Sequence, residues 1–319
     1  MKALLARGYG LADALRCEEI ARPSPADDEV LIRVHAASVN PLDWRLKKGS
    51  PFFFRLMLGL RAPKDPRCGH DVAGTVEAVG SKVTRFRPGD AVFGACHGAF
   101  AEYACAGESR LAAKPENANF EQAAALPVAG LTALQGLRDK GRLRAGQKVL
   151  VNGAAGGVGT FAVQIARASD AEVTGVCSFG NADMVRSIGA DHVLDYARED
   201  FTRGDRRYDL ILDAIGNHSL PALRRALAPG GICALAGARG VWSGVGRALA
   251  APAYSLYGDR KVVAYMGRIT SEDLAALAGL VSSGGIVPVI ERTYPLAQAA
   301  EALRHSEQGH SRGKVIVVP

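Results

Sequence analysis

The residues with the clearest chemical meaning form a glycine-rich turn within 148–166, KVLVNGAAGGVGTFAVQIA. Apolar residues lead up to this turn, and a pattern typical of a helix with one buried face follows it. Small residues stand at the three positions where a dinucleotide-binding turn needs a tight bend, a close approach to pyrophosphate, and close packing of helix on strand. The residues expected to hold the pyrophosphate are Ala154, Gly156, Gly157, Val158 and Gly159. An anion is favoured there by the free N–H groups and the dipole of the helix. The alternative, a turn without a ligand, is less consistent with the strands and helices that follow.

The next strand indicates which dinucleotide would bind. An NAD site usually has an Asp or Glu about 20 residues after the turn, where it bonds the ribose 2′-hydroxyl. Here the strand 172–177 is followed by Ser178 and has no acid at its tip. Ser178 and Asn181 could both donate hydrogen bonds to a 2′-phosphate, which predicts NADP(H), although no Lys or Arg lies close to them in the sequence. Ser178 could also cap the helix that starts near Asn181, and both roles are compatible.

Two kinds of pattern divide the 319 residues and indicate two domains. Residues 1–120 contain short alternating strands separated by turn residues, which predicts an antiparallel, partly barrelled β domain. After Glu121 apolar strands alternate with helices, including a helix over 157–168, which predicts a doubly wound parallel sheet. We therefore expect an α/β protein with a catalytic domain formed by 1–122 and 269–319, and a Rossmann domain over 123–268. The last strand, 314–319, is expected to return to the first domain.

Composition excludes several functional classes. No apolar run reaches the roughly 18 residues of a membrane helix, and Arg7 and Asp13 interrupt the apolar N-terminus, so we expect a cytoplasmic protein without a membrane partner. The six cysteines form no C-x-x-C pair, which is unlike a disulfide framework. The net charge of +7 would suit a polyanion, but it also fits solvated arginines and a phosphate-rich cofactor, and no nucleic-acid-binding motif is present.

Five segments resemble a known family when they are taken together and in order. They are AASVNPLDWRLKKG, LPVAGLTAL, NGAAGGVG, GADHVLDY and GHSRGK. They are similar to the medium-chain dehydrogenase/reductase superfamily, and specifically to its quinone oxidoreductase-like branch. The resemblance implies a GroES-like catalytic domain, a Rossmann domain and an active site in the cleft between them. It also implies hydride transfer from NADPH to a quinone or an activated α,β-unsaturated carbonyl, and we expect a homodimer.

The same resemblance predicts that zinc is absent. Zinc-containing relatives in the alcohol dehydrogenase branch have a cysteine where this chain has Asn40, a histidine where it has His70, and commonly a cysteine where it has Val128. A catalytic zinc needs three protein ligands, mostly Cys or His, so one histidine does not make a site. His70 could line the cleft or serve as a hydrogen-bonded structural residue.

The resemblance also suggests roles for further residues. Asn40, Asp43 and Thr132 match positions near the nicotinamide, with an Asx-turn, a helix cap and a helix back-bond as their structural alternatives. The cofactor positions implied by the family are Tyr196, Gly237, Ala238, Arg312, Gly313 and Lys314. For Tyr196 and for the basic turn at 312–314 a plain surface role is the alternative. The apolar segment 241–258 could line the substrate mouth or be a packed helix.

Two other functions remain open from the sequence. An alkenal or enoyl-thioester reductase would use the same cofactor with a different acceptor pocket. A non-enzymatic NADPH-binding protein could contact RNA through its basic surface, in which case binding would depend on salt.

Overall fold

The computed structural model describes residues 1–319 except 11–13, 50–54, 56–58, 257 and 310. The chain forms two compact units. The first unit contains Met1–Ala129, Ile269–Gly284 and Pro288–Pro319, and the second contains Gly130–Arg268 and Gly285–Val287. The sequence predicts the first domain boundary at 122/123. The observed boundary lies seven residues later, at 129/130, within the helix α4 (Pro127–Gln135).

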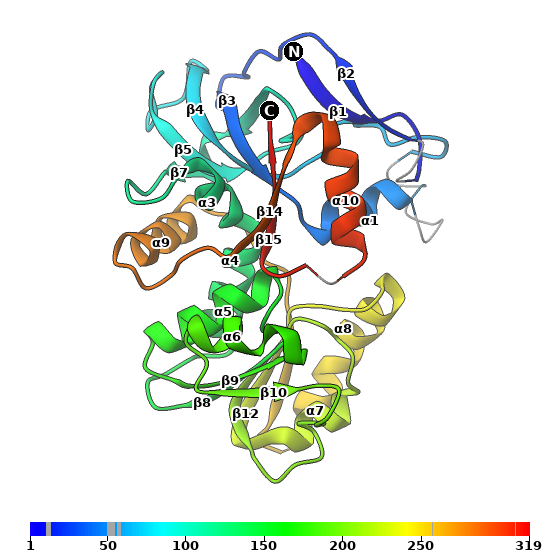
Figure 1. Cartoon of the computed structure of the whole chain (residues 1–319), viewed down its shortest axis with the longest axis vertical. Helices are drawn as coiled ribbons and strands as arrows, with labels where there is room; N and C mark the ends of the chain where they lie inside the picture. Colours follow the sequence, from blue (N-terminus) through cyan, green and yellow to red (C-terminus); the bar gives the residue numbers. More distant parts are fainter. Residues whose placement is uncertain (11–13, 50–54, 56–58, 257, 310) are drawn as a thin grey trace. The chain divides into compact units, whose positions relative to one another are not determined.

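A seven-stranded sheet forms the centre of the first unit (Figure 1). Its order is β14-β15-β3-β4-β5-β7, with β6 also paired to β3. The strands are β3 (Glu29–Ser38), β4 (Asp71–Val79), β5 (Ala91–Ala95), β6 (Tyr103–Gly107), β7 (Leu111–Ala113), β14 (Ile290–Pro295) and β15 (Lys314–Val318). All pairs are antiparallel except β14 with β15. The last strand of the chain does return to this unit, because β15 pairs with the end of β3.

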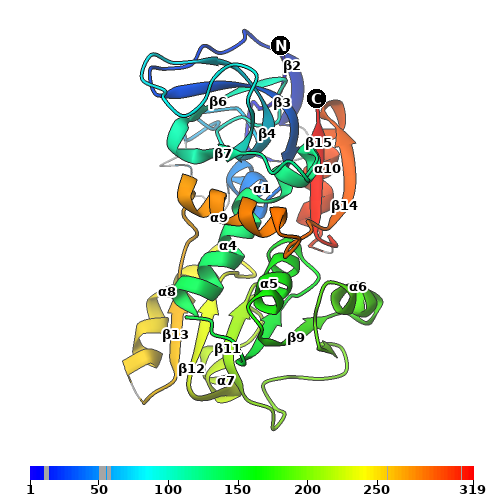
Figure 2. The same cartoon turned by 90° about the vertical axis from the view of Figure 1, so that its left-hand side faces the viewer.

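Smaller elements surround this sheet. A hairpin joins β1 (Lys2–Ala6) to β2 (Leu15–Glu19). The helices that the structure describes in this unit include α1 (Pro41–Lys48), α3 (Phe120–Ala125), α9 (Ser271–Ser282) and α10 (Ala299–Glu307), with short helices η1 (Glu108–Arg110) and η4 (Leu296–Gln298). Figure 2 shows α10 beside β14 and β15. The core beneath them contains an apolar cluster that includes Ile32, Val72, Phe100 and Leu303.

The second unit is a parallel sheet in the order β10-β9-β8-β11-β12-β13. Its strands are β8 (Lys148–Asn152), β9 (Glu172–Cys177), β10 (His192–Asp195), β11 (Tyr208–Asp213), β12 (Leu227–Leu235) and β13 (Lys261–Ala264). Its helices are α5 (Gly157–Ala168), α6 (Ala182–Ser187), α7 (Leu220–Ala226) and α8 (Val241–Leu256), with the short helices η2 (Gly136–Lys140) and η3 (Phe179–Asn181). The strand order reverses between β8 and β11, and ligands of such sheets bind outside the carboxyl ends of the strands at that point. The protein is therefore an α/β protein with a doubly wound sheet, as the sequence predicts.

No helix in the described part of the chain is both long enough and apolar enough to span a bilayer.

Candidate functional site

The turn between β8 and α5 leaves the start of the helix open. The amide N–H groups of Gly153 and Ala154 both donate to the carbonyl of Val176, at 3.1 and 2.9 Å, which ties the turn to β9. Gly153 has a φ of +89°, a conformation that favours glycine. Gly156 precedes α5, and its lack of a side chain means that no capping hydrogen bond is made there. The first N–H groups of α5 are thus not covered by a capping side chain, as an anion site requires.

Gly159 and Gly156 are both glycines of the turn, but the absence of a side chain has a different consequence at each position. A Cβ added at Gly159 would lie 2.0 Å from the carbonyl oxygen of Gly153 and 2.8 Å from Cα of Ala154, so this position serves close packing of helix on turn. A Cβ added at Gly156 would have Gly153 O, at 3.6 Å, as its nearest neighbour, so the space in front of this residue is open. The turn therefore fits the pyrophosphate of a dinucleotide.

The tip of β9 brings three of the predicted cofactor residues together. Asn181 donates from Nδ2 to Ser178 Oγ at 3.1 Å. The side chain of neither residue makes a capping hydrogen bond, so the capping alternative for Ser178 is not observed. Tyr196 donates its backbone N–H to the carbonyl of Cys177 at 3.1 Å, which places it at the same tip. Sequence reasoning missed a further residue here, Arg198, whose guanidinium lies 5.4 Å from the ring centroid of Phe179.

A buried ion pair at the end of β11 was also missed. Asp213 is fully buried; it accepts hydrogen bonds from Asn152 Nδ2 at 2.8 Å and from the Gly216 N–H at 2.9 Å, and it forms an ion pair with Arg247 of α8. This pair joins α8 to the carboxyl edge of the sheet beside the β8/β11 reversal. A buried charge needs such partners, since an unpaired one would be costly.

The loop after β12 packs against the same edge. Gly237 donates its N–H to the carbonyl of Asp213 at 3.0 Å, and a Cβ there would lie 1.9 Å from the carbonyl oxygen of Ala214. Ala238 follows it, and a Cβ added at Gly244 of α8 would lie 3.1 Å from the Ala238 Cβ. These contacts place both predicted residues, Gly237 and Ala238, at the carboxyl edge where a ligand is expected.

The segment 241–258 forms the helix α8 over Val241–Leu256. Ala251 is its buried residue, while Trp242, Val245 and Leu249 are 64%, 45% and 78% exposed. Because these positions are three and four residues apart, the exposed side chains share one face. The helix therefore packs on one side and presents an apolar surface on the other.

In the first unit, Asp43 and His70 form a hydrogen-bonded dyad. The Asp43 carboxylate is buried; it accepts from the backbone N–H of Asn40 at 2.7 Å and contacts His70 Nδ1. The His70 side chain is 16% exposed. Burial opposes its protonation, but the hydrogen bond to Asp43 and the charges of Asp43 and Asp71 outweigh this and raise the pKa of His70 above its ordinary value. His70 Nδ1–H donates to the Asp43 carboxylate and fixes the ring, so Nε2 is the nitrogen that gains or loses a proton.

Asn40 joins this dyad to a second buried pair. Its Nδ2 donates to Asp71 Oδ2 at 2.8 Å, and its Oδ1 accepts from Lys314 Nζ at 2.7 Å. Lys314 also donates to the Val39 carbonyl at 3.1 Å and lies 3.8 Å from Asp71 Oδ2. Burial raises the pKa of Asp71 to about 6, with Lys314 opposing that rise, and burial lowers the pKa of Lys314. Asn40 is thus saturated by protein partners.

Four further predicted residues lie in the following surroundings, and only the side chain of Lys314 is placed against its expected role. The Lys314 ammonium is buried in this network, so its side chain is not available to a cofactor phosphate. Gly313 has a φ of +74°, and a Cβ there would lie 2.2 Å from the Val289 carbonyl oxygen. The local backbone therefore requires glycine at this position. Arg312 is exposed beside them. Thr132 lies on α4 in the second unit, and its backbone carbonyl accepts from the Tyr265 hydroxyl at 2.6 Å.

Two of the three positions compared with zinc ligands, Asn40 and Val128, make hydrogen bonds to protein groups. The Asn40 carboxamide oxygen is already bonded to an ammonium. Val128 offers only its backbone, whose N–H donates to Asp71 Oδ1 at 3.1 Å. Among the residues that the structure describes, no three His, Cys, Asp or Glu side chains are grouped so that they could hold a metal ion.

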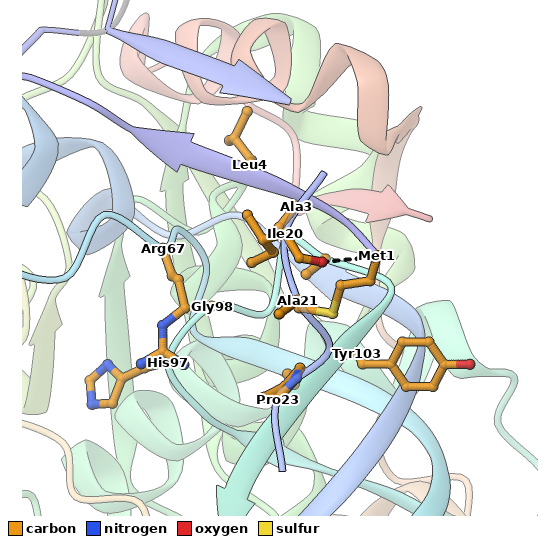
Figure 3. Close-up of a pocket in the computed structure, with 12 residues that line it drawn as sticks. Met1, Ala3, Leu4, Ile20, Ala21, Pro23, Arg67, His97, Gly98 and Tyr103 are labelled. Carbon is orange, nitrogen blue, oxygen red and sulfur yellow. Dashed lines mark hydrogen bonds between the residues drawn. The ribbon is translucent and has the colours of Figure 1, made fainter. Parts of the chain in front are cut away.

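A small cavity lies elsewhere in the first unit (Figure 3). It measures about 150 Å³ and is lined mostly by apolar residues of the β1–β2 region and of 97–104, with Arg67 and His97 at one end. The His97 ring meets the edge of His70, with ring centroids 5.5 Å apart. None of the predicted site residues lines this cavity.

Comparison with known proteins decides the family. Residues 26–116 match the model for the alcohol dehydrogenase GroES-like domain, and residues 188–317 match the model for zinc-binding dehydrogenase. The chloroplast envelope quinone oxidoreductase homolog of Arabidopsis thaliana is 33% identical over 100% of this chain and 98% of its own length. This chain belongs to the medium-chain dehydrogenase/reductase superfamily, in its quinone oxidoreductase-like branch.

Two further members support this assignment. The NADPH-dependent alkenal/one oxidoreductase of Arabidopsis thaliana is 34% identical over 100% of the chain and 80% of its own length. The structure of the quinone oxidoreductase from Coxiella burnetii superimposes with a TM-score of 0.87 at 30% identity, covering 100% of this chain and 99% of that one. The protein is therefore an oxidoreductase of a nicotinamide-dependent family, with a GroES-like domain and a Rossmann domain.

Proposed function

We propose that this medium-chain reductase uses NADPH to reduce a quinone or an activated enone without zinc. The observation that carries the proposal is the open turn before α5 together with the tip of β9, where Ser178 and Asn181 stand in place of an acid. When bound, the reduced nicotinamide supplies a hydride. With one proton from solvent, the balanced reaction converts NADPH, H⁺ and quinone into NADP⁺ and hydroquinone.

The preference for NADPH follows from the chemistry at Ser178. A charge-assisted hydrogen bond to a phosphate contributes about 1.5–3 kcal/mol, so we expect roughly tenfold or more tighter binding of NADPH than of NADH. Ser178→Asp places a carboxylate against the 2′-phosphate and should reverse the preference. Ser187→Asp adds the same charge at an exposed position of α6 and is the matched control. Equal affinities in the wild type, or NADPH preference retained in Ser178→Asp, would contradict this assignment.

The independence from zinc follows from the buried network. A divalent ion between Asn40 and His70 would have to displace the Lys314 ammonium from Asn40 Oδ1, and Val128 provides no side-chain ligand. Metal analysis of protein purified without a metal-binding tag should find less than one-tenth of a zinc per chain. One zinc per chain, lost together with activity on chelation, would overturn this part of the proposal.

We infer the class of hydride acceptor from two features of the chain. Asn40 and Val128 replace zinc ligands, and helix α8 has an exposed apolar face. Oxidation of a simple alcohol needs strong stabilisation of an alkoxide, which zinc supplies in the metal-containing relatives. A quinone or enone spreads the incoming charge over a conjugated system, so it needs less help from the protein. The exposed apolar face of α8 suits a flat conjugated ring.

Asn40 and Asp43 act in this scheme as positioning residues. Both are buried and bonded to protein groups: Asp43 holds the His70 ring, and Asn40 links Lys314 to Asp71. Asn40→Ala should lower the turnover rate by a larger factor than it lowers the affinity for NADPH. A panel of 1,4-benzoquinone, 9,10-phenanthrenequinone, short enals and primary alcohols tests the acceptor class. Metal-free oxidation of alcohols with no reduction of any quinone or enal would contradict it.

A further inference from the structure

The loop after β10 lies against the tip of β9, where the adenosine ribose of a bound dinucleotide is expected. The two strands are parallel neighbours with Asp195 paired to Cys177, and the Tyr196 N–H continues this ladder to the Cys177 carbonyl (Figure 1). Residues that directly follow β10 are therefore neighbours of Ser178 and Phe179 in space, although about 20 positions separate them in the sequence.

Arg198 is held at this tip by an aromatic ring. Its guanidinium carbon lies 5.4 Å from the centroid of Phe179, within the range of a cation–π contact. Phe179 is 70% exposed and Tyr196 is 60% exposed, so two aromatic rings and one guanidinium stand in solvent at the same edge of the sheet. A phosphate arriving beside Ser178 would meet a cation whose position is already restricted.

Among the described residues, Arg198 is a cation near this tip that is free to turn toward a phosphate. Its partner Asp195 lies 3.7 Å away, and the Arg198 side chain is 74% exposed, so this ion pair contributes little. Asp195 Oδ1 also accepts the Ala197 N–H at 3.0 Å. Arg186 lies near Cys177 as well, but it pairs more closely with Asp183, at 3.0 Å.

We propose that Arg198, positioned by Phe179, binds the 2′-phosphate of NADPH and is the main determinant of cofactor choice in this chain. The proposal rests on the NADPH preference proposed above. Ser178 and Asn181 add hydrogen bonds from neutral donors, whereas the guanidinium also carries a positive charge and can bind two phosphate oxygens at once. Tyr196, two residues before Arg198, has a side chain that is 60% exposed, and bases stack on aromatic side chains of this kind.

Binding of matched ligand pairs tests this directly, without any need for turnover. Dissociation constants are measured by calorimetry for NADPH and NADH, and for adenosine 2′,5′-bisphosphate and 5′-AMP, which differ only in the 2′-phosphate. Arg198→Ala should weaken NADPH and the bisphosphate roughly tenfold to hundredfold, and should leave NADH and 5′-AMP within about twofold. Arg198→Lys should fall between the wild type and Arg198→Ala.

Arg203→Ala is the matched control. Arg203 is 84% exposed and forms the same kind of ion pair with Asp200 three residues earlier, at 3.3 Å, but it lies five residues further along the β10–β11 connection than Arg198. All four constants should stay within twofold of the wild type. Equal losses in Arg203→Ala and Arg198→Ala would show a general charge effect and refute the proposal.

Two outcomes separate this inference from the proposed function. If the wild type prefers NADPH and Arg198→Ala keeps the full preference, the role of Arg198 is refuted and the NADPH preference stands. If the wild type binds NADPH and NADH equally, the preference itself fails and the role of Arg198 fails with it.

The positioning role of Phe179 has its own readout. Raising the salt concentration should weaken NADPH more than NADH in the wild type, because the ion pair is screened, and this difference should disappear in Arg198→Ala. Phe179→Ala should reduce the NADPH preference several-fold, while Phe179→Tyr, which keeps a ring under the guanidinium, should restore it. Identical preference in Phe179→Ala and Phe179→Tyr would refute the positioning role.

Discussion

Gly156→Ala and Gly159→Ala should change different properties of the protein, although the two positions are only three residues apart. The first should weaken NADPH binding, and the second should lower the melting temperature. At Gly159 the new methyl would lie 2.0 Å from one backbone oxygen and 2.8 Å from Cα of Ala154, so backbone must move. Overpacking of this kind costs about 1–3 kcal/mol. With roughly 2–4 °C of Tm per kcal/mol for chains of 150–250 residues, we expect a decrease of about 2–12 °C.

At Gly156 the same methyl meets only an ordinary contact at 3.6 Å. Its φ of −83° and ψ of 177° are open to any residue. Alanine loses less backbone entropy on folding, worth about 0.4–1 kcal/mol, but it is a poorer residue than glycine before a helix by about the same amount. Tm should therefore stay within about 2 °C of the wild type. The methyl fills the space through which a pyrophosphate would approach, so NADPH affinity should fall roughly 5- to 150-fold.

Thermal unfolding and NADPH fluorescence titration on the same samples distinguish the two effects. Gly204→Ala is the control, because a Cβ at Gly204 would meet nothing within 4 Å. Wild-type NADPH affinity in Gly156→Ala would show that the turn does not receive the pyrophosphate. A wild-type Tm in Gly159→Ala would show that the packing of α5 on the turn tolerates a methyl group, against the geometry.

Two further predictions concern the first unit and the thiols. Lys314→Ala should lower the free energy of unfolding by about 3–5 kcal/mol, because it leaves the Asp71 carboxylate buried without its cation. Adding Asp71→Asn should recover part of that loss in urea unfolding, and no recovery would mean that the two groups are not coupled. Cys17 is the exposed thiol, while burial raises the pKa of Cys68 and Cys96 to about 12. Ellman's reagent at pH 8 should therefore label one thiol per native chain quickly and all six after denaturation; six fast thiols in the native protein would contradict the burial.

The sequence predicted the parts of the fold that depend on local pattern. The helix expected over 157–168 is α5, the apolar stretch before the glycine-rich turn is β8, and the strand expected over 172–177 is β9. Two local signals are involved: the periodicity of apolar residues and the small residues of the turn. Each depends only on residues close together in the sequence, so each is visible without the structure. The family resemblance then predicted the fold of each of the two domains.

The sequence did not predict contacts made between distant segments. Arg198 contacts Phe179 because of the β9–β10 register, and no local signal near Ser178 indicates it. Lys314 was expected near a phosphate because its segment resembles a family segment near the cofactor, but β15 inserts beside β3 and places its ammonium against Asn40, 274 residues away. The dyad of Asp43 and His70 likewise depends on how α1 and the start of β4 meet.

The most direct test of the proposed function is a stoichiometric turnover measurement on metal-free enzyme. Protein treated with a chelator and checked for residual metal is mixed anaerobically with NADPH and 9,10-phenanthrenequinone. NADPH oxidation is followed at 340 nm, and the hydroquinone is quantified by chromatography. We expect one hydroquinone per NADPH consumed, at the rate of the untreated enzyme. Absence of NADPH oxidation with every quinone and enal tried, or activity that disappears with the metal and returns on adding zinc, would contradict the proposed function.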